Sequence, residues 1–496
     1  MSSSHLDLGQ ARKRAKELLR AARAGNAEAV ERVGVSPRLA DAQRVIAREL
    51  GHASWADLKQ HVEAERASFE ERVQGFVEDA TEGRRERAER WLERDPGIAG
   101  AGVVPALILG DLSRVQTELR RDPALSRVQL RPRGWTPLMY VCHSCFLGSD
   151  PARIEGLVAV ARLLLAEGAD PNVSEPSPNW PGSMWTPLYG AAGVAHEPEL
   201  TRLLLEAGAS PDDGESVYHS CETRDHTCLR LLLDHGAKVN GTNALPHMLD
   251  YDDLEGLRLL LEAGADPNEG GLHHAIVRGR DPSFIELLVE HGADPRRPRR
   301  DGLTPYALAV RLNRSEVAEL LTRLGAAPTA GPVDAFLAAL RRGDAGVVET
   351  ALADNPGLVQ SLRPGELELL PESATWTDDT TLRLVLDAGF PLHTRGELDG
   401  TALHHAAWWG QARNVGLLLE RGADVHAGSW FGPDSTPLAW TTHGSTACPH
   451  PEGDWLAVAD LLVEAGAKIG RGMLDDADDE LAEWLAERLP DEQADR

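Results

Sequence analysis

Leucine stripes recur along the chain at a nearly constant interval. The leucines of each stripe, joined by an Ile or Val one turn earlier, have the spacing of one face of a helix. A glycine follows each stripe, where it suits the left-handed conformation that ends a helix. These glycines are Gly168, Gly208, Gly236, Gly264, Gly292, Gly325, Gly389, Gly422 and Gly466. The repeat is about 33 residues long, with some copies nearer 28, so each unit is too small to fold alone and must stack on its neighbours.

A second helix is predicted ahead of each stripe. The letters WTPL at 135 and 185, LTPY at 303 and STPL at 435 place a capping threonine before a proline, which the first turn of a helix tolerates. ADPN and ADVH then lead from one unit into the next. Over residues 134–328 and 397–470 this pattern resembles the ankyrin repeat, with its T-P-L-H-x-A opening and Gly-Ala-Asp close. The resemblance implies an all-α solenoid of helix-turn-helix units joined by short hairpins.

The rest of the chain keeps a plainer form of the same pattern. Residues 67–133 and 329–396 read as degenerate ankyrin-like helix pairs, which brings the array to roughly twelve units. We expect residues 1–66 to form a helical cap, and residues 471–496 a capping helix with an acidic tail. Whether 332–370 is a hinge stays open.

Some units depart from the regular length. The shorter steps between Gly208 and Gly292 lack the usual Asp-Gly turn, so we expect trimmed or missing hairpins there. Insertions occur at 143–156, 172–184 and 443–455. Long loops on a regular scaffold are where function concentrates, although sequence drift explains them equally well.

Composition narrows the class of protein. The net charge of −27 opposes unassisted binding to nucleic acid, and no apolar stretch is long enough to span a membrane. No signal peptide is evident at the N-terminus. Five cysteines in 496 residues favour free thiols and a cytoplasmic location.

Candidate metal and catalytic residues fall into three separate groups. A structural zinc site needs four ligands at one point, and groups in distant repeats cannot share an ion. On the repeat register, Cys221 and Cys228 take packing positions, so we expect both to be buried thiols. We predict no metal, cofactor or catalytic residue. The groups are Cys142 and Cys145; His219, Cys221, His226 and Cys228; and His443, Cys448 and His450. An enzymatic or metal-dependent role hidden in an insertion remains the more distant alternative.

Two histidines take the place of the T-P-L-H histidine. These are His273 and His404. The resemblance implies that each ties the turn between repeats through hydrogen bonds.

A helix-turn-helix-like stretch lies near the N-terminus. Residues 46–62 combine an apolar helix, a glycine and a second helix opened by Ser54. The second helix is nearly balanced in charge, whereas a DNA reader needs Arg, Lys, Asn or Gln there. A capping pair is the preferred interpretation, and a DNA-associated regulator is the alternative.

One predicted hairpin is strongly basic. PRRPRRDG at 295–302 carries Arg296, Arg297, Arg299 and Arg300. The hairpin is either a solvated loop or a docking point for an acidic segment of a partner or of this chain.

Aromatic residues gather in the last repeats. Counting from Thr401, Trp408 and Trp409 take the two places that vary between ankyrin proteins and face the concave groove. Trp376, Trp430 and Phe431 take groove or hairpin-tip places in neighbouring units, and Tyr251 does so farther upstream. Clustered exposed aromatics make binding hot spots. The alternative is that Trp408 and Trp409 pack against 443–455, as we expect Trp440 to do.

The sequence therefore predicts a protein-interaction scaffold without chemistry of its own. We expect an unidentified protein partner along the groove and the hairpin tips, and no nucleic acid or membrane. The repeat pattern names neither the partner, the pathway nor the oligomeric state.

Overall fold

Helices build almost all of the structure. The computed structural model describes residues 8–34, 39–52, 54, 55, 58, 62, 67–177, 183–448, 450, 452–470 and 472–489. The chain divides into two compact units. The middle unit comprises Gln60–Pro305 and Glu319–Ala326, and the terminal unit comprises Met1–Lys59, Tyr306–Ala318 and Ala327–Arg496. No helix among the described residues is long and apolar enough to cross a membrane.

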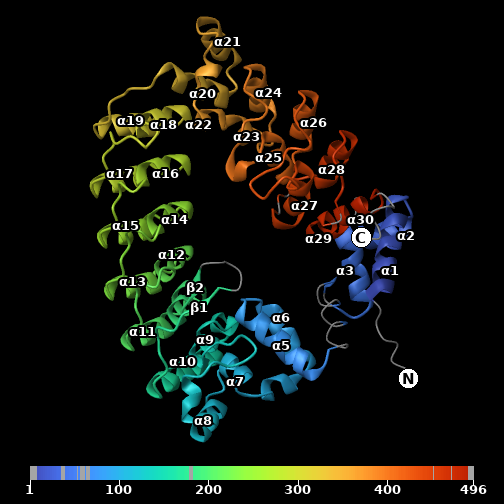
Figure 1. Cartoon of the computed structure of the whole chain (residues 1–496), viewed down its shortest axis with the longest axis vertical. Coiled ribbons are helices and arrows are strands. Elements are labelled where there is room, and N and C mark those ends of the chain that lie inside the picture. The colour runs from blue at the N-terminus through green and yellow to red at the C-terminus, as the bar shows by residue number, and fades with distance from the viewer. Residues whose placement is uncertain are drawn as a thin grey trace. The chain divides into compact units, whose positions relative to one another are not determined.

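Short helix pairs follow one another through the middle unit. In Figure 1, α12, α14 and α16 form one column of helices, and α13, α15 and α17 form the other. Its helices are α5 (Phe69–Thr81), α6 (Arg85–Arg94), α7 (Val103–Leu109), α8 (Leu112–Arg121), α9 (Pro137–Cys142), α10 (Pro151–Ala166), the π-helix η4 (Tyr189–Val194), α11 (Pro198–Glu206), α12 (Ser216–His219), the 3-10 turn η5 (Ser220–Glu222), α13 (Thr227–Asp234), α14 (Ala244–Asp250), α15 (Leu254–Glu262), α16 (Gly271–Val277) and α17 (Pro282–Glu290).

The terminal unit is built in the same way. The pair at which the chain passes between the units is α18 (Pro305–Arg311) and α19 (Ser315–Arg323). The remaining helices are α1 (Leu8–Arg23), α2 (Ala27–Val33), α3 (Leu39–Glu49), α20 (Pro332–Arg342), α21 (Ala345–Asp354), α22 (Pro364–Leu367), α23 (Leu369–Ser373), α24 (Thr380–Asp387), α25 (Ala402–Trp408), α26 (Ala412–Glu420), α27 (Pro437–Ala447), α28 (Trp455–Glu464), α29 (Met473–Asp476) and α30 (Asp479–Ala486). Residues 329–396 contain the helices α20 to α24.

The connections match the sequence pattern. Nine residues separate α13 from α14, and eight separate α15 from α16, whereas a full hairpin of sixteen residues separates α26 from α27. The trimmed hairpins are therefore confirmed. The insertion 172–184 carries a two-stranded antiparallel ladder, β1 (Glu175–Pro176) with β2 (Met184–Trp185).

The repeated leucines form the core that joins the pairs. The second leucine of the stripe has no exposed surface in eight copies: Leu164, Leu204, Leu232, Leu260, Leu288, Leu321, Leu418 and Leu462. All nine stripe-ending glycines have a positive φ, between +80° at Gly168 and +101° at Gly466. The predicted left-handed helix ends are confirmed, because residues with a side chain rarely adopt that conformation.

Asparagine side chains clamp successive repeats together. Asn240 donates from Nδ2 to the carbonyl of Gly264 (2.9 Å) and accepts from the amide of Asp266 (2.7 Å). Asn268 makes the same two bonds to Gly292 and Asp294. One planar amide thus satisfies a helix-end carbonyl and the next turn, which sets the register of neighbouring units.

The last repeats of the terminal unit are covered by α30, and α1 lies against α30 in turn. Leu481 and Leu485 of α30 are fully buried in the core of the terminal unit. The basic helix α1 lies against the acidic α30, with Lys16 Nζ 3.2 Å from an oxygen of Glu483. Arg23 pairs with Glu480 in the same way.

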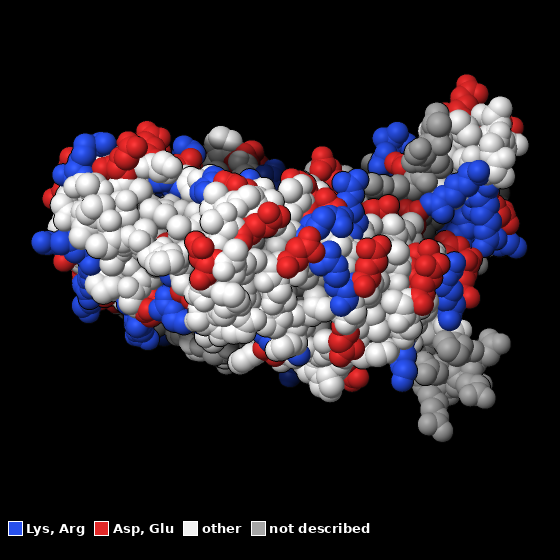
Figure 2. Space-filling model, turned by 90° about the horizontal axis from the view of Figure 1, so that it is seen from above, with Lys and Arg blue, Asp and Glu red and all other residues white. Residues whose placement is uncertain are grey.

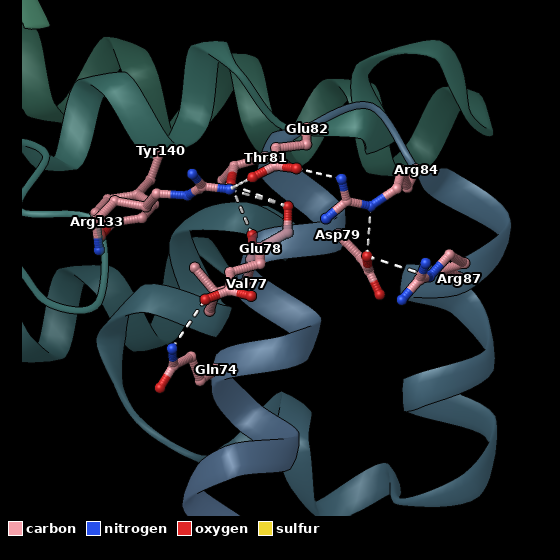
Figure 3. A network of polar contacts seen from close by, with 10 residues as sticks. All are labelled: Gln74, Val77, Glu78, Asp79, Thr81, Glu82, Arg84, Arg87, Arg133 and Tyr140. Carbon is pink, nitrogen blue, oxygen red and sulfur yellow. Dashed lines mark hydrogen bonds and ion pairs between the residues drawn. The ribbon is translucent and has the colours of Figure 1, made fainter. Parts of the chain in front are cut away.

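A polar network holds the first helix pair of the middle unit (Figure 3). Asp79 is 2% exposed, accepts from Nε1 of Trp91 at 2.9 Å and lies 2.6 Å from Nε of Arg84. Arg84 and Arg133 both pair with Glu82. Arg133 also donates to Oγ1 of Thr81 at 3.2 Å. The network links α5 and α6 to the turn that precedes α9.

Removing the buried carboxylate should loosen this pair. Asp79→Ala leaves the indole N–H of Trp91 without its acceptor and removes one of the two carboxylates that pair with Arg84, so we expect a loss of about 2 kcal/mol in the free energy of unfolding. Hydrogen exchange of the α5 and α6 amides should rise with it. Glu86→Ala, which changes a 92% exposed carboxylate on α6, is the control. Unchanged exchange in Asp79→Ala would show that the network does not hold the pair.

Candidate functional site

Two aromatic rings stand exposed at the tip of one hairpin. Trp430 is 76% and Phe431 68% exposed, between α26 and α27. Leu398, at the tip of the preceding hairpin, is 48% exposed. The amide of Trp430 donates to the carbonyl of Leu398 at 3.0 Å, so the two tips lie side by side. We call Leu398, Trp430 and Phe431 the tip patch.

The backbone below the tip patch is well supported. Ser429 and Gly432 exchange backbone hydrogen bonds of 3.2 and 3.0 Å across the turn. Arg395 donates to the carbonyl of Asp399 at 2.7 Å and also to that of Gly428. Oγ of Ser429 accepts from Nε1 of the buried Trp440 at 3.2 Å. The exposed rings therefore sit on a hairpin tied to its neighbour and to the core.

Trp408 and Trp409 have a different environment. Both are half-buried. The ring of Trp408 lies 5.9 Å from that of Trp440 and 5.2 Å from that of His443, and its carbonyl accepts from Nε1 of Trp455 at 3.0 Å. The Trp409 ring lies 5.8 Å from that of His450. Described residues of the insertion 443–455 thus partly cover the pair, and its partner-binding role stays a prediction.

Trp376 is a half-buried part of the terminal core. It packs against the buried cluster there, its ring lies 6.0 Å from the Arg341 guanidinium, and its carbonyl accepts from Asn414. The described ring contacts of Trp408 and Trp409 lead to other residues, so the structure does not bring the predicted aromatic set into one cluster. Trp440 is 6% exposed, and its predicted core position is confirmed.

The predicted residues of the middle unit are exposed. Tyr251 is 44% exposed and contacts the ring of His247 edge-on. In the arginine hairpin, Arg296 lies 3.3 Å from Asp294 and Arg299 lies 2.7 Å from Asp301, so these two pair with carboxylates of their own hairpin. Arg297 and Arg300 line an open cavity of about 600 Å³ between this hairpin and the preceding one.

The two register histidines make the expected turn bonds. Nδ1 of the fully buried His404 accepts from the amide of Thr401 at 3.1 Å, and Nε2 donates to the carbonyl of Ser435 at 3.1 Å. His273 bonds to the carbonyl of Leu303 at 3.0 Å. Burial lowers the pKa of His404 to about 4. Both histidines therefore link one unit to the next hairpin.

Three of the five cysteines are buried thiols. Cys142, Cys221 and Cys228 are buried, and all five cysteines are free. Burial raises the pKa of Cys228 to about 11 and that of Cys145 to about 12. Within the described residues no group of three or more His, Cys, Asp or Glu side chains could hold a metal ion.

The helix-turn-helix-like stretch is described only in part. Ile46 and Ala47 of α3 are buried, as are Trp55, Leu58 and Val62. The other residues of the expected second helix, apart from Ser54, lie outside the described residues.

Charges of both signs are mixed on the face shown in Figure 2. Lys and Arg side chains lie beside Asp and Glu side chains there, with uncharged surface between them. The net charge of −27 is therefore not spread as a uniform acidic coat over this face.

Tandem helix pairs, left-handed helix ends and hairpin connections define a repeat protein of the solenoid class. The family described as "Ankyrin repeats (3 copies)" matches residues 191–270 and 245–331, and "Ankyrin repeat" matches 133–175 and 399–430. The chain therefore contains ankyrin repeats over these residues.

The comparison with solved structures includes the human ASB11 ankyrin repeat domain. That crystal structure is 20% identical, with a TM-score of 0.22, and the match covers 50% of this chain and 97% of that one. No curated protein matches the chain.

Sequence reasoning missed Leu398. Its backbone has a φ of +53°, which is uncommon for leucine, and the GELDG letters at 396–400 give no sign of an exposed apolar tip. Only the hydrogen bond between neighbouring hairpins places it beside Trp430.

The buried histidine should make stability depend on pH. An unfolded histidine has a pKa of about 6.5, so below that pH the unfolded state takes up a proton that the folded state, with a His404 pKa of about 4, does not. Stability is retained above pH 6.5 and is lost as the pH falls. We expect His404 to contribute about 2 kcal/mol of this loss between pH 7 and pH 5.

Urea denaturation at the two pH values measures the effect. His404→Gln should lose less free energy of unfolding between pH 7 and pH 5 than the unchanged chain. His393→Gln, at an exposed histidine in the same unit, should keep the original difference. Equal pH dependence in all three proteins would contradict the assignment.

Proposed function

We propose that this protein is an interaction scaffold that binds a protein partner through exposed positions of its repeats. The ankyrin repeat is a general protein-interaction fold, and this role needs no catalytic group or cofactor. The observation that carries the proposal is the tip patch, where Trp430 and Phe431 are exposed on a hydrogen-bonded hairpin.

The tip patch has the physical character of a binding hot spot. Aromatic rings bury a large area at a small cost in side-chain entropy, and rings on an ordered hairpin lose less freedom on binding than rings on a loose loop. Scattered exposed apolar residues are normal on a soluble protein, but Trp430, Phe431 and Leu398 are adjacent. A partner with an apolar pocket or groove would cover them.

Trp408 and Trp409 contribute to the proposal as support. Their contacts with Trp440, His443 and His450 hold the helix pair beneath the hairpin. The arginine hairpin and Tyr251 are proposed as additional contacts in the middle unit. Each retains exposed surface.

Two double variants separate binding from folding. Trp430→Ala with Phe431→Ala removes the tip rings, so we expect partner capture from lysate to fall at least tenfold while the melting temperature stays unchanged. Trp408→Ala with Trp409→Ala removes packed rings, so we expect it to lower the melting temperature.

Quantitative mass spectrometry of the captured proteins, with circular dichroism melting, is the measurement. Val347→Ala, at a 43% exposed apolar residue of α21, is the matched control and should capture normally. Full capture by the folded tip variant would refute the assignment of the tip patch.

A further inference from the structure

A continuous series of rings follows the first helices of the middle unit. The ring of Tyr189 lies 5.1 Å from that of His219 in the next repeat. Tyr218 stacks on His247 of the repeat after that, at 3.8 Å with planes 13° apart, and His247 meets Tyr251 edge-on at 5.1 Å. We call these five residues the ring ladder.

The rings of the ring ladder lie on or beside the first helices of three consecutive repeats and are partly exposed. The ring ladder is carried by η4, α12 and α14 and ends beside α14, on the column of first helices in Figure 1. Tyr189 and Tyr218 are half-buried, and Tyr251 is 44% exposed. The rings therefore present part of their surface to solvent while packing on one another.

Carboxylates alternate with the imidazoles of the ring ladder. Oε1 of Glu222 lies 2.8 Å from Nδ1 of His219 and 3.3 Å from Nε2 of His247. Glu215 lies 3.4 Å from Nε2 of His219. Side chains of both carboxylates are about a third exposed, at 32% and 28%.

Asp250 adds a third carboxylate at the exposed end. Its Oδ1 lies 2.7 Å from Nε2 of His274 and 2.6 Å from Nε of Arg278. Among the described ion pairs of Glu215, Glu222 and Asp250, Arg278 is the only permanently charged cation. The three acids therefore leave an excess of negative charge on this surface.

The tyrosines report the same excess. Burial, and after it the charges of Glu215 and Glu222, together raise the pKa of Tyr189 to about 12. The pKa of Tyr251 is raised by burial and then by Glu222 and Asp250. Negative charge thus faces the rings from neighbouring repeats.

We infer that the ring ladder and its three carboxylates bind an extended protein segment that carries arginine or lysine side chains. A guanidinium can stack on a tyrosine face while its N–H groups bond to a carboxylate. Glu222, which bridges His219 and His247 and is about a third exposed, is placed beside the ring ladder to accept such a cation. This inference rests on the proposed scaffold function and names the chemistry of one partner segment.

Charge complementarity decides against other occupants. An acidic segment would meet three carboxylates, and a purely apolar segment would bury them without compensation. A basic segment gains both from the three carboxylates and from the exposed faces of the rings. Steering by the negative surface would also speed its association, and added salt would weaken binding.

Fluorescence anisotropy with two labelled twelve-residue peptides tests the inference on the full chain. One peptide alternates arginine with glycine, and the other alternates glutamate with glycine. We expect the arginine peptide to bind and the glutamate peptide not to bind. Glu222→Gln with Asp250→Asn should weaken the arginine peptide by about tenfold.

Matched variants separate the site from general attraction to an acidic protein. Glu206→Gln with Glu262→Gln removes two exposed charges from the ends of α11 and α15, and should change affinity by less than twofold. Tyr251→Phe keeps the ring and should bind normally, whereas Tyr251→Leu should weaken binding several-fold. Equal weakening by both charge pairs, or binding of the glutamate peptide, would overturn the inference.

Two further readouts keep the outcomes distinct. The double variant Trp430→Ala with Phe431→Ala changes the tip patch in the terminal unit and should leave peptide affinity unchanged. Failure of the ring ladder and failure of the tip patch therefore give different results.

Sedimentation of the chain alone tests whether a second copy of the chain occupies the ring ladder. A dimer that dissociates when Arg296, Arg297, Arg299 and Arg300 are changed to Ser would assign the surface to self-association and refute the external segment.

Discussion

Burial of one leucine per repeat is the constraint on which this structure depends. A single helix pair exposes the apolar stripe that carries this leucine, and only the next pair covers it. Leu204, Leu232, Leu260 and Leu288 lose all their exposed surface in this way in consecutive repeats. Because each unit is stable only beside its neighbours, the array must continue until helices of another kind close it, as α30 does with Leu481 and Leu485.

The same constraint separates support from function within each unit. Second helices, glycine ends and the clamps of Asn240 and Asn268 fix the spacing between repeats. The outward positions of first helices and the hairpin tips carry little of that packing, so their residues are free to differ. Both proposed surfaces use such positions: the tip patch uses hairpin tips of the terminal unit, and the ring ladder uses first helices of the middle unit.

Much of the fold followed from local chemistry in the sequence. The repeat period and the stripe-ending glycines predicted the helix pairs. The T-P-L-H register predicted the turn bonds of His404 and the buried thiols of Cys221 and Cys228. Each of these features depends only on one unit and its neighbour. The sequence left open whether the insertion 443–455 covers Trp408 and Trp409, since the path of that insertion lies outside the repeat pattern.

The functional surfaces were harder to predict for a related reason. Leu398 and Trp430 belong to different hairpins, and a backbone hydrogen bond brings them together. Tyr218 and His247 stack across two repeats although nothing in either segment marks the other. Contacts of this kind depend on the stagger between repeats, and a pattern within one repeat does not encode it.

Site-specific photo-crosslinking measures whether the exposed aromatic residues of the hydrogen-bonded hairpin tip contact a protein partner. A photoreactive phenylalanine analogue at position 430 should yield one dominant protein adduct in lysate, and the same analogue at position 347 of the outward-facing α21 should not. Adducts of equal yield and variety from both positions would contradict the account.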